Sequence, residues 1–298
     1  MPATVKRART ALVLCLALAL CGSAAFASPR DLAEVKSSGV LRHLGIAYAN
    51  FITGQGDGLD VDLMRLFARH LGVHYVYVPT DWDTLFPDLT GRKHRTKGAD
   101  VELLGEAPVK GDVIASGLTV LPWRQKLVDF SRPTFPTQVW LVVKAESKVT
   151  PIAPSGDIKK DIDLTRGKLR GLSLLCKSGT CLDPALFNLE PTGAKPRLFP
   201  GSLNDLAPAL ILKGETDATL LDVPDALVAL QKYPGKIKII GPMSDTQDMA
   251  VAFAKQSPRL REEFDRFFAA LQQSGEYDRM IKRYYPFVTT YFPKYFSK

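Results

Sequence analysis

One stretch of the chain, residues 111–131 with the sequence GDVIASGLTVLPWRQKLVDFS, limits the possible folds most strongly. It begins with the apolar run Val113 to Ala115, which is typical of a strand covered on both faces in a sheet of parallel strands. Small residues end the run, and a turn containing Pro122 leads to a single arginine, Arg124. A strand tip leaves backbone N–H groups free, and an arginine can hold a carboxylate through two parallel hydrogen bonds. The stretch therefore predicts an anion-binding corner, whereas a surface arginine after an ordinary turn is the alternative for this residue taken alone.

Strand-like and helix-like segments alternate along the chain in two series. Between the series, residues 144–165 are polar and contain Pro151, Pro154 and Gly156, as expected for a connection between domains. The pattern predicts an α/β fold with parallel sheets in two lobes, and ligands of such folds bind outside the carboxyl ends of the strands. The chain is expected to cross between the lobes near Val143 and near Val251. Strands are predicted over 40–46, 74–78, 113–115, 137–143, 172–175, 196–199, 217–221, 237–240 and 249–254, and helices over 60–71, 84–89, 182–189, 202–213, 224–231, 257–274 and 277–284.

The first 27 residues have the pattern of a cleavable secretion signal. Basic residues at positions 6, 7 and 9 precede the apolar stretch 11–20, which is too short for a stable membrane anchor, and Ala25-Phe26-Ala27 forms a cleavage site. We expect a mature chain that starts at Ser28 and is exported as a soluble, periplasmic protein. Cleavage before Cys21, as in a lipoprotein, is the alternative, but it would need a small residue where Leu20 stands.

The charge of the mature chain does not favour a nucleic-acid partner. Removal of the three basic signal residues changes the net charge from +8 to +5, and the remaining basic residues are scattered apart from the cluster at 92–97. That cluster lies in residues 90–110, which are rich in Gly, Lys and Arg and which predict a surface loop or a small hairpin.

Two cysteines remain after the signal is removed. Cys176 and Cys181 enclose a short segment with a glycine, and in an oxidising compartment this spacing favours a disulfide. The alternative is two reduced cysteines, one that ends a strand and one that opens a helix. Neither has a histidine or a third cysteine nearby, so we expect no metal site, and no cofactor motif is present.

A series of short motifs, each weak alone, follows the order seen in one protein family. They include Tyr48-Ala49-Asn50-Phe51, Gly58-Leu59-Asp60-Val61-Asp62-Leu63, Asp81-Trp82-Asp83-Thr84-Leu85, Thr119 through Arg124, Val128-Asp129-Phe130-Ser131, Ser178-Gly179-Thr180, Gly214-Glu215-Thr216-Asp217-Ala218 with Asp222, and Gly275-Glu276-Tyr277. With these motifs the chain resembles the bacterial extracellular solute-binding proteins of family 3, the periplasmic amino-acid receptors of ABC importers. The resemblance implies a type II periplasmic-binding fold, in which two α/β lobes joined by two hinge strands close on a ligand. It places residues 28–143 and 251–298 in the first lobe and residues 144–250 in the second.

The resemblance also implies a set of ligand-binding residues. Arg124 matches the arginine that pairs with the ligand α-carboxylate, with Thr119 and the Gly117 backbone beside it, and Asp222 matches the acid that holds the α-ammonium group. Thr180 lies at a turn that opens a helix, where free N–H groups favour an anion. The aromatic residues Tyr48 and Trp82 match positions that sandwich the ligand side chain. Gly117 and Cys181 stand where the family usually has hydroxyl side chains, so we expect the carboxylate to depend more on backbone N–H groups.

Three functions are compatible with this resemblance. The favoured function is a monomeric receptor that delivers a carboxylate-bearing solute, an amino acid or a close analogue, to an ABC permease. The second is a sensing module without transport. The third is an enzyme related to cyclohexadienyl dehydratases, which would need a general acid or base in the cleft; the four histidines are expected to lie away from it, so we predict no catalysis. Murein transglycosylases with a similar first domain carry a second, catalytic domain that has no counterpart here.

Overall fold

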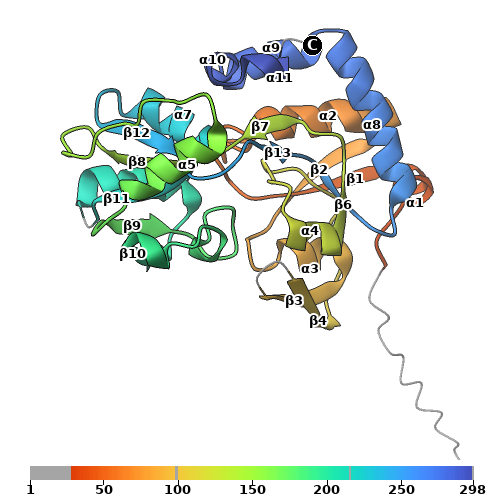
Figure 1. The fold of residues 1–298 in the computed structure, drawn as a ribbon. Helices are drawn as coiled ribbons and strands as arrows, with labels where there is room; N and C mark the ends of the chain where they lie inside the picture. Colours follow the sequence, from red (N-terminus) through yellow and green to blue (C-terminus); the bar gives the residue numbers. More distant parts are fainter. Residues whose placement is uncertain (1–27, 98–99, 215, 297–298) are drawn as a thin grey trace, which may run out of the picture.

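The computed structural model describes residues 28–97, 100–214 and 216–296, and these residues form two α/β lobes joined by a two-stranded ribbon (Figure 1). The predicted secretion signal lies outside the described residues. Among the described residues, no helix combines the length and the apolar character needed to cross a bilayer.

The first lobe is built on a five-stranded sheet in the order β2-β1-β5-β14-β6. The strands β2, β1 and β5 run parallel, whereas β14 pairs antiparallel with both β5 and β6. The strands of this sheet are β1 (Val40–Gly45), β2 (His74–Pro79), β5 (Val113–Ile114), β6 (Val128–Phe130) and β14 (Ala252–Ala254). Its helices are α1 (Leu32–Ser38), α2 (Leu59–Leu71), α3 (Leu85–Thr90), α4 (Pro122–Leu127), α8 (Pro258–Gln273), α9 (Glu276–Tyr284), α10 (Val288–Tyr291) and α11 (Pro293–Phe296).

The second lobe has a sheet in the order β10-β9-β11-β8-β12. Here β10, β9 and β11 run parallel, and β8 is antiparallel to both of its neighbours. The elements of this lobe are β8 (Val139–Lys144), β9 (Ser173–Cys176), β10 (Lys195–Leu198), β11 (Ala218–Asp222), β12 (Ile237–Pro242), α5 (Ile158–Gly167), η1 (Pro184–Leu186), η2 (Glu190–Thr192), η3 (Leu203–Asp205), α6 (Leu206–Pro208), η4 (Ala209–Lys213) and α7 (Val223–Lys232).

The hinge is the antiparallel ribbon of β7 (Phe135–Thr137) and β13 (Gln247–Met249). Because β8 lies inside the second sheet, the chain changes lobe before β8, and the predicted boundary at residue 143 was wrong. The sequence could not distinguish the two possibilities, since a largely apolar strand such as β8 can belong to the sheet of either lobe.

The predicted helices form where an apolar stripe can be buried. Helix α2 ends at Gly72, which has the left-handed φ of 73°. The apolar face of α2 is buried. In α8, the predicted stripe is buried, and Phe264 packs edge-on against Phe67 of α2 with ring centroids 5.2 Å apart. These two helices cover one face of the first sheet (Figure 1).

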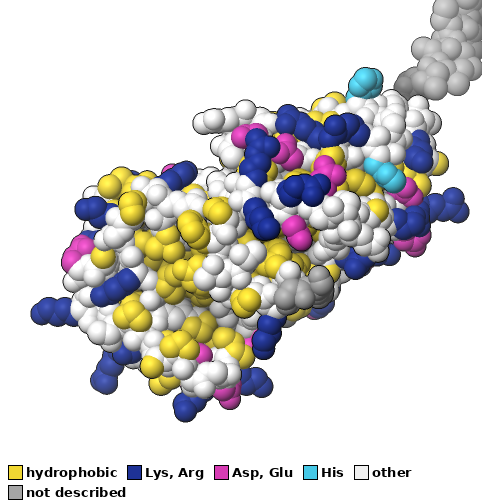
Figure 2. All heavy atoms as spheres, turned by 90° about the horizontal axis from the view of Figure 1, so that it is seen from above, with side chains coloured by type: hydrophobic (Ala, Val, Ile, Leu, Met, Phe, Trp, Pro, Cys, Tyr) yellow, Lys and Arg dark blue, Asp and Glu magenta, His cyan; other side chains and the backbone are white. Residues whose placement is uncertain are grey.

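The hairpin region and the C-terminal region both contain regular secondary structure. Residues 90–110 form the predicted hairpin from β3 (Arg92–Lys97) and β4 (Asp100–Glu106), which lies against α3 and α4. The last described residues, which include several Tyr and Phe, form α10 and α11. These helices lie above the hinge ribbon in Figure 1, and Tyr291 packs on Trp140 of β8. Figure 2 looks onto this face, where hydrophobic side chains gather near the middle and Lys and Arg side chains are spread around them.

Candidate ligand-binding site

The predicted arginine, Arg124, lies at the contact between the two lobes and is 1% exposed. It comes from the short helix α4, which starts with Pro122 and is placed by the parallel strand β5 before it and by β6 after it. Its Nη1 donates to the carbonyl oxygen of Thr119 at 2.8 Å, whereas Nε and Nη2 are buried and have no hydrogen-bond partner among the described residues. These two nitrogens form one edge of the guanidinium plane, the edge that holds a carboxylate through two parallel hydrogen bonds.

Three aromatic rings surround the guanidinium of Arg124. The Cζ atom lies 5.2 Å from the ring centroid of Trp123, 5.6 Å from Trp82 and 5.9 Å from Phe86. Cation–π attraction offsets part of the cost of burying the charge. Burial still lowers the pKa of Arg124 to about 10, while the negative groups around it oppose that change, so the side chain is a cation at neutral pH.

On the opposite wall, Asp222 lies at the carboxyl end of β11 and caps α7. Its Oδ1 accepts from the Thr137 hydroxyl and from the Val223 N–H at 3.0 Å. Its Oδ2 accepts from the Cys181 thiol at 3.1 Å and from the Tyr48 hydroxyl at 3.4 Å. Burial raises the pKa of Asp222, and these hydrogen bonds oppose the rise.

A hydrogen bond joins the walls of the cleft. Tyr48, in the loop after β1, donates its hydroxyl proton to Asp222 of the second lobe at 3.4 Å. Burial and the nearby Asp222 raise the pKa of Cys181 well above its usual value, so the thiol keeps its proton. The structure thus brings four of the predicted residues, Arg124, Thr119, Tyr48 and Asp222, close together.

The other predicted residues have different surroundings. The Gly117 N–H donates to Asp60 at 2.7 Å and is therefore not free for a ligand. The hydroxyl of Thr180 donates to Lys177 and accepts from the Leu182 N–H, as in an ordinary turn. Trp82 packs against Arg124, whereas the hydroxyl of Tyr48, also in the first lobe, reaches across to Asp222.

The predicted disulfide is absent, because both cysteines are free thiols. The Sγ of Cys176 faces the carbonyl oxygen of Leu174, whereas the Sγ of Cys181 is turned to Asp222. Cys181 is thus a cleft residue rather than half of a crosslink. Sequence reasoning considered it as half of a disulfide and as a replaced hydroxyl, and it missed Thr137, because one threonine at the start of a predicted strand carries no recognisable signal.

A further pair of contacts between the lobes lies next to Tyr48. Asn204 of η3 donates through Nδ2 to the Ala47 carbonyl oxygen at 3.2 Å, and its Oδ1 accepts from the Ala49 N–H at 2.7 Å. Ala49 has φ of 45°, a conformation that is uncommon outside glycine. We call these two hydrogen bonds the Asn204 latch, because they hold the closed arrangement at the cleft entrance.

The histidines were predicted to lie away from the cleft. His43 is buried in β1, where Nε2 lies 2.6 Å from the Ala115 carbonyl oxygen and burial lowers the pKa to about 4. His94 of β3 is closer than predicted: its ring stacks on Trp123, one of the rings around Arg124. Within the described residues, no group of three or more His, Cys, Asp or Glu side chains could hold a metal ion.

Comparisons with known proteins agree with this geometry. The model of the family described as bacterial extracellular solute-binding proteins, family 3, matches residues 47–102 and 107–287. The lysine/arginine/ornithine-binding periplasmic protein of Escherichia coli is 25% identical, covering 80% of this chain and 85% of that protein. The membrane-bound lytic murein transglycosylase F of Desulfosudis oleivorans is 29% identical over 236 residues, but the match covers 78% of this chain and only 45% of the transglycosylase.

Solved structures of amino-acid-binding proteins have the same fold. The P235GK mutant of ArgBP from T. maritima superposes with a TM-score of 0.66 at 27% identity, over 86% of this chain and 99% of that one. The ancestral amino-acid-binding protein AncCDT-1, described as a precursor of cyclohexadienyl dehydratase, gives a TM-score of 0.64 at 25% identity, over 85% and 98%.

Proposed function

The chain belongs to the bacterial extracellular solute-binding proteins, family 3, and from this premise we propose that it is a periplasmic receptor for a carboxylate-bearing solute, an amino acid or a close analogue. The solute lies between the lobes, and the closed protein presents it to an ABC permease for import. The single observation that carries the proposal is the unpartnered edge of Arg124, with Nε and Nη2 buried between the lobes. A buried guanidinium with two unused donors is costly, and a carboxylate at that edge supplies both acceptors.

The opposite wall supports an amino acid. Asp222 supplies a carboxylate from the second lobe, so a ligand with adjacent anionic and cationic groups would contact both lobes and favour closure. Relatives with names such as histidine-binding and lysine/arginine/ornithine-binding proteins fit the same ligand class.

The test is a thermal-shift screen of amino acids and simple carboxylates on the chain from Ser28 onward. A ligand present at 100 times its dissociation constant should stabilise the protein by about 2.7 kcal/mol. Arg124→Ala should abolish the shift, and Arg124→Lys, which keeps the charge but lacks the two-donor edge, should reduce affinity by at least about 100-fold. Arg259→Ala, at an exposed position of α8, is the matched control. A ligand that stabilises Arg124→Lys and wild type equally would refute the role of Arg124.

A dehydratase is the second candidate because of the likeness to AncCDT-1. We propose binding without catalysis, since Asp222 already accepts four hydrogen bonds and is poorly placed to transfer a proton. Incubation with prephenate or arogenate should give no aromatic product, and formation of phenylpyruvate or phenylalanine at a rate that depends on enzyme concentration would overturn this view.

A further inference from the structure

A second cavity lies between the lobes, outside the cleft that contains Arg124. Its volume is about 330 Å³. The loop 49–57 of the first lobe forms one wall, and residues of η3, α6, β11 and α7 form the other. Neither Arg124 nor Asp222 lines it, so it is a separate site from the proposed carboxylate site.

The buried carboxylate of Asp225 lines this cavity. Asp225 is 6% exposed, and its Oδ2 has no hydrogen-bond partner among the described residues. Burial and the nearby Asp222 raise the pKa of Asp225 well above its usual value, and hydrogen bonding to Tyr48 opposes the rise. An ionised carboxylate in such surroundings is strongly destabilised unless a cation lies beside it.

The remaining lining is mixed. The second lobe contributes the apolar side chains of Leu203, Leu221 and Val228 beside polar ones such as Asn204, and the loop of the first lobe contributes Thr53, Gln55 and Asp57. An ion with an apolar stem can bury that stem against the first set while its charge faces Asp225. The described residues hold no cluster suited to a metal ion, which favours an organic cation.

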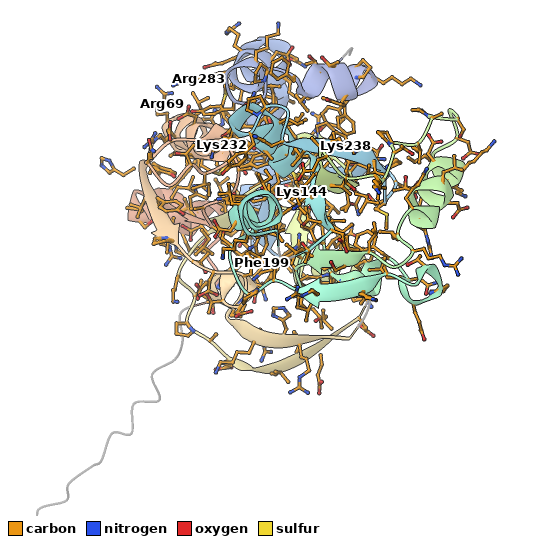
Figure 3. The ribbon with its side chains drawn as sticks, turned by 90° about the vertical axis from the view of Figure 1, so that its left-hand side faces the viewer. Arg69, Lys144, Phe199, Lys232, Lys238 and Arg283 are labelled. Carbon is orange, nitrogen blue, oxygen red and sulfur yellow. The ribbon has the colours of Figure 1, made fainter. Side chains whose placement is uncertain are left out.

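The charges at the cavity indicate one positive charge on the ligand. Asp57 and Asp225 are acidic, and Lys232, at the end of α7 and labelled in Figure 3, adds one positive charge to the lining. Lys232 is exposed, so it does not replace a buried partner for Asp225. A second positive charge on the ligand would be repelled by Lys232.

We propose that this cavity binds a primary alkyl ammonium ion, with its nitrogen against Asp225 and its stem along the apolar wall. Because both lobes line the cavity, the bound ion contacts both at once. Occupation therefore favours the same closed arrangement that the Asn204 latch holds.

The test uses butylammonium chloride on the chain from Ser28 onward, in wild type and in Arg124→Lys, with sodium chloride at equal ionic strength as the reference. We expect saturable stabilisation of both proteins in thermal unfolding. Asp225→Asn, which keeps the shape and removes the charge, should abolish the stabilisation. Asp163→Asn, at an exposed position of α5, is the matched control and should leave it unchanged.

A second variant keeps the proposal testable if Asp225→Asn does not fold. Ala229→Leu places a larger side chain in the cavity and leaves Asp57 and Asp225 unchanged. This variant should weaken butylammonium binding at least tenfold. Equal stabilisation by tetramethylammonium chloride, which has the charge but no N–H donor, would overturn the proposal, and so would the absence of any shift in wild type. Because Arg124→Lys is compromised only in the cleft, these outcomes are distinct from a failure of the carboxylate site.

Discussion

The two walls of the cleft differ in how fully their hydrogen-bonding groups are used. In the first lobe, Arg124 has two buried donors without partners, whereas in the second lobe both oxygens of Asp222 accept two hydrogen bonds each. One wall is therefore prepared for an anion before a ligand arrives. On the other wall, Asp222 must give up existing hydrogen bonds before it can bind an ammonium group. We expect the ligand to replace the weak hydrogen bonds from Tyr48 and Cys181. The carboxylate should consequently contribute more binding energy than the ammonium group.

After Arg124→Ala, the largest expected effect within this comparison is that of Asp222→Asn. Loss of the charge should weaken binding of an amino acid about 10- to 100-fold, the usual size of a hydrogen bond to a charged group, which is less than the effect of Arg124→Ala. Because asparagine caps helices as well as aspartate does, the unfolding free energy should change little. Isothermal titration of the ligand found in the screen would measure the affinity. An effect larger than that of Arg124→Ala would reverse the proposed order of the two walls.

A smaller effect is expected from the Asn204 latch. Asn204→Ala removes two hydrogen bonds that exist only between closed lobes, each worth about 1 kcal/mol. Ligand affinity should fall about fivefold or more through the closing equilibrium, while a carboxylate should still bind. Asp205→Ala, at the neighbouring exposed position of η3, serves as the control. Unchanged affinity in Asn204→Ala would show that the latch does not contribute to closure.

The smallest effect on ligand affinity is expected from Asp60, which accepts the N–H of Gly117 beneath the Arg124 wall and acts on stability instead. Burial raises the pKa of Asp60 from 3.8 to about 7. Between these values the unfolded chain releases the proton and the folded protein keeps it, so this group lowers the unfolding free energy as pH rises from about 4 to 7. In Asp60→Asn, this contribution to the decline of the unfolding free energy with pH should be absent.

The measurement for Asp60 is the thermal midpoint of both proteins between pH 4 and pH 8. The difference between the variant and wild type should increase with pH and level off above pH 7. Parallel curves would mean that Asp60 titrates at its ordinary pKa in the folded protein.

Much of the fold was predictable from local patterns. The apolar stripes of α2 and α8 and the glycine after α2 specify helices wherever they stand in the chain. Arg124 could be predicted because it follows a buried strand within an ordered set of motifs. By contrast, the sequence predicted the second lobe to start after residue 143, because β8 is apolar from Val139 to Val143 and only its pairing shows which sheet it joins.

The sequence by itself determined the α/β class, the family and the arginine, because periodicity and short-range order are written in consecutive residues. Only the tertiary structure decided which groups face one another. It turned the Cys181 thiol toward Asp222 instead of Cys176, and it used the Gly117 N–H for Asp60. It also left one edge of Arg124 and one oxygen of Asp225 without partners. These outcomes depend on contacts between residues tens to hundreds of positions apart, and such contacts are fixed by packing of the whole chain rather than by any local pattern.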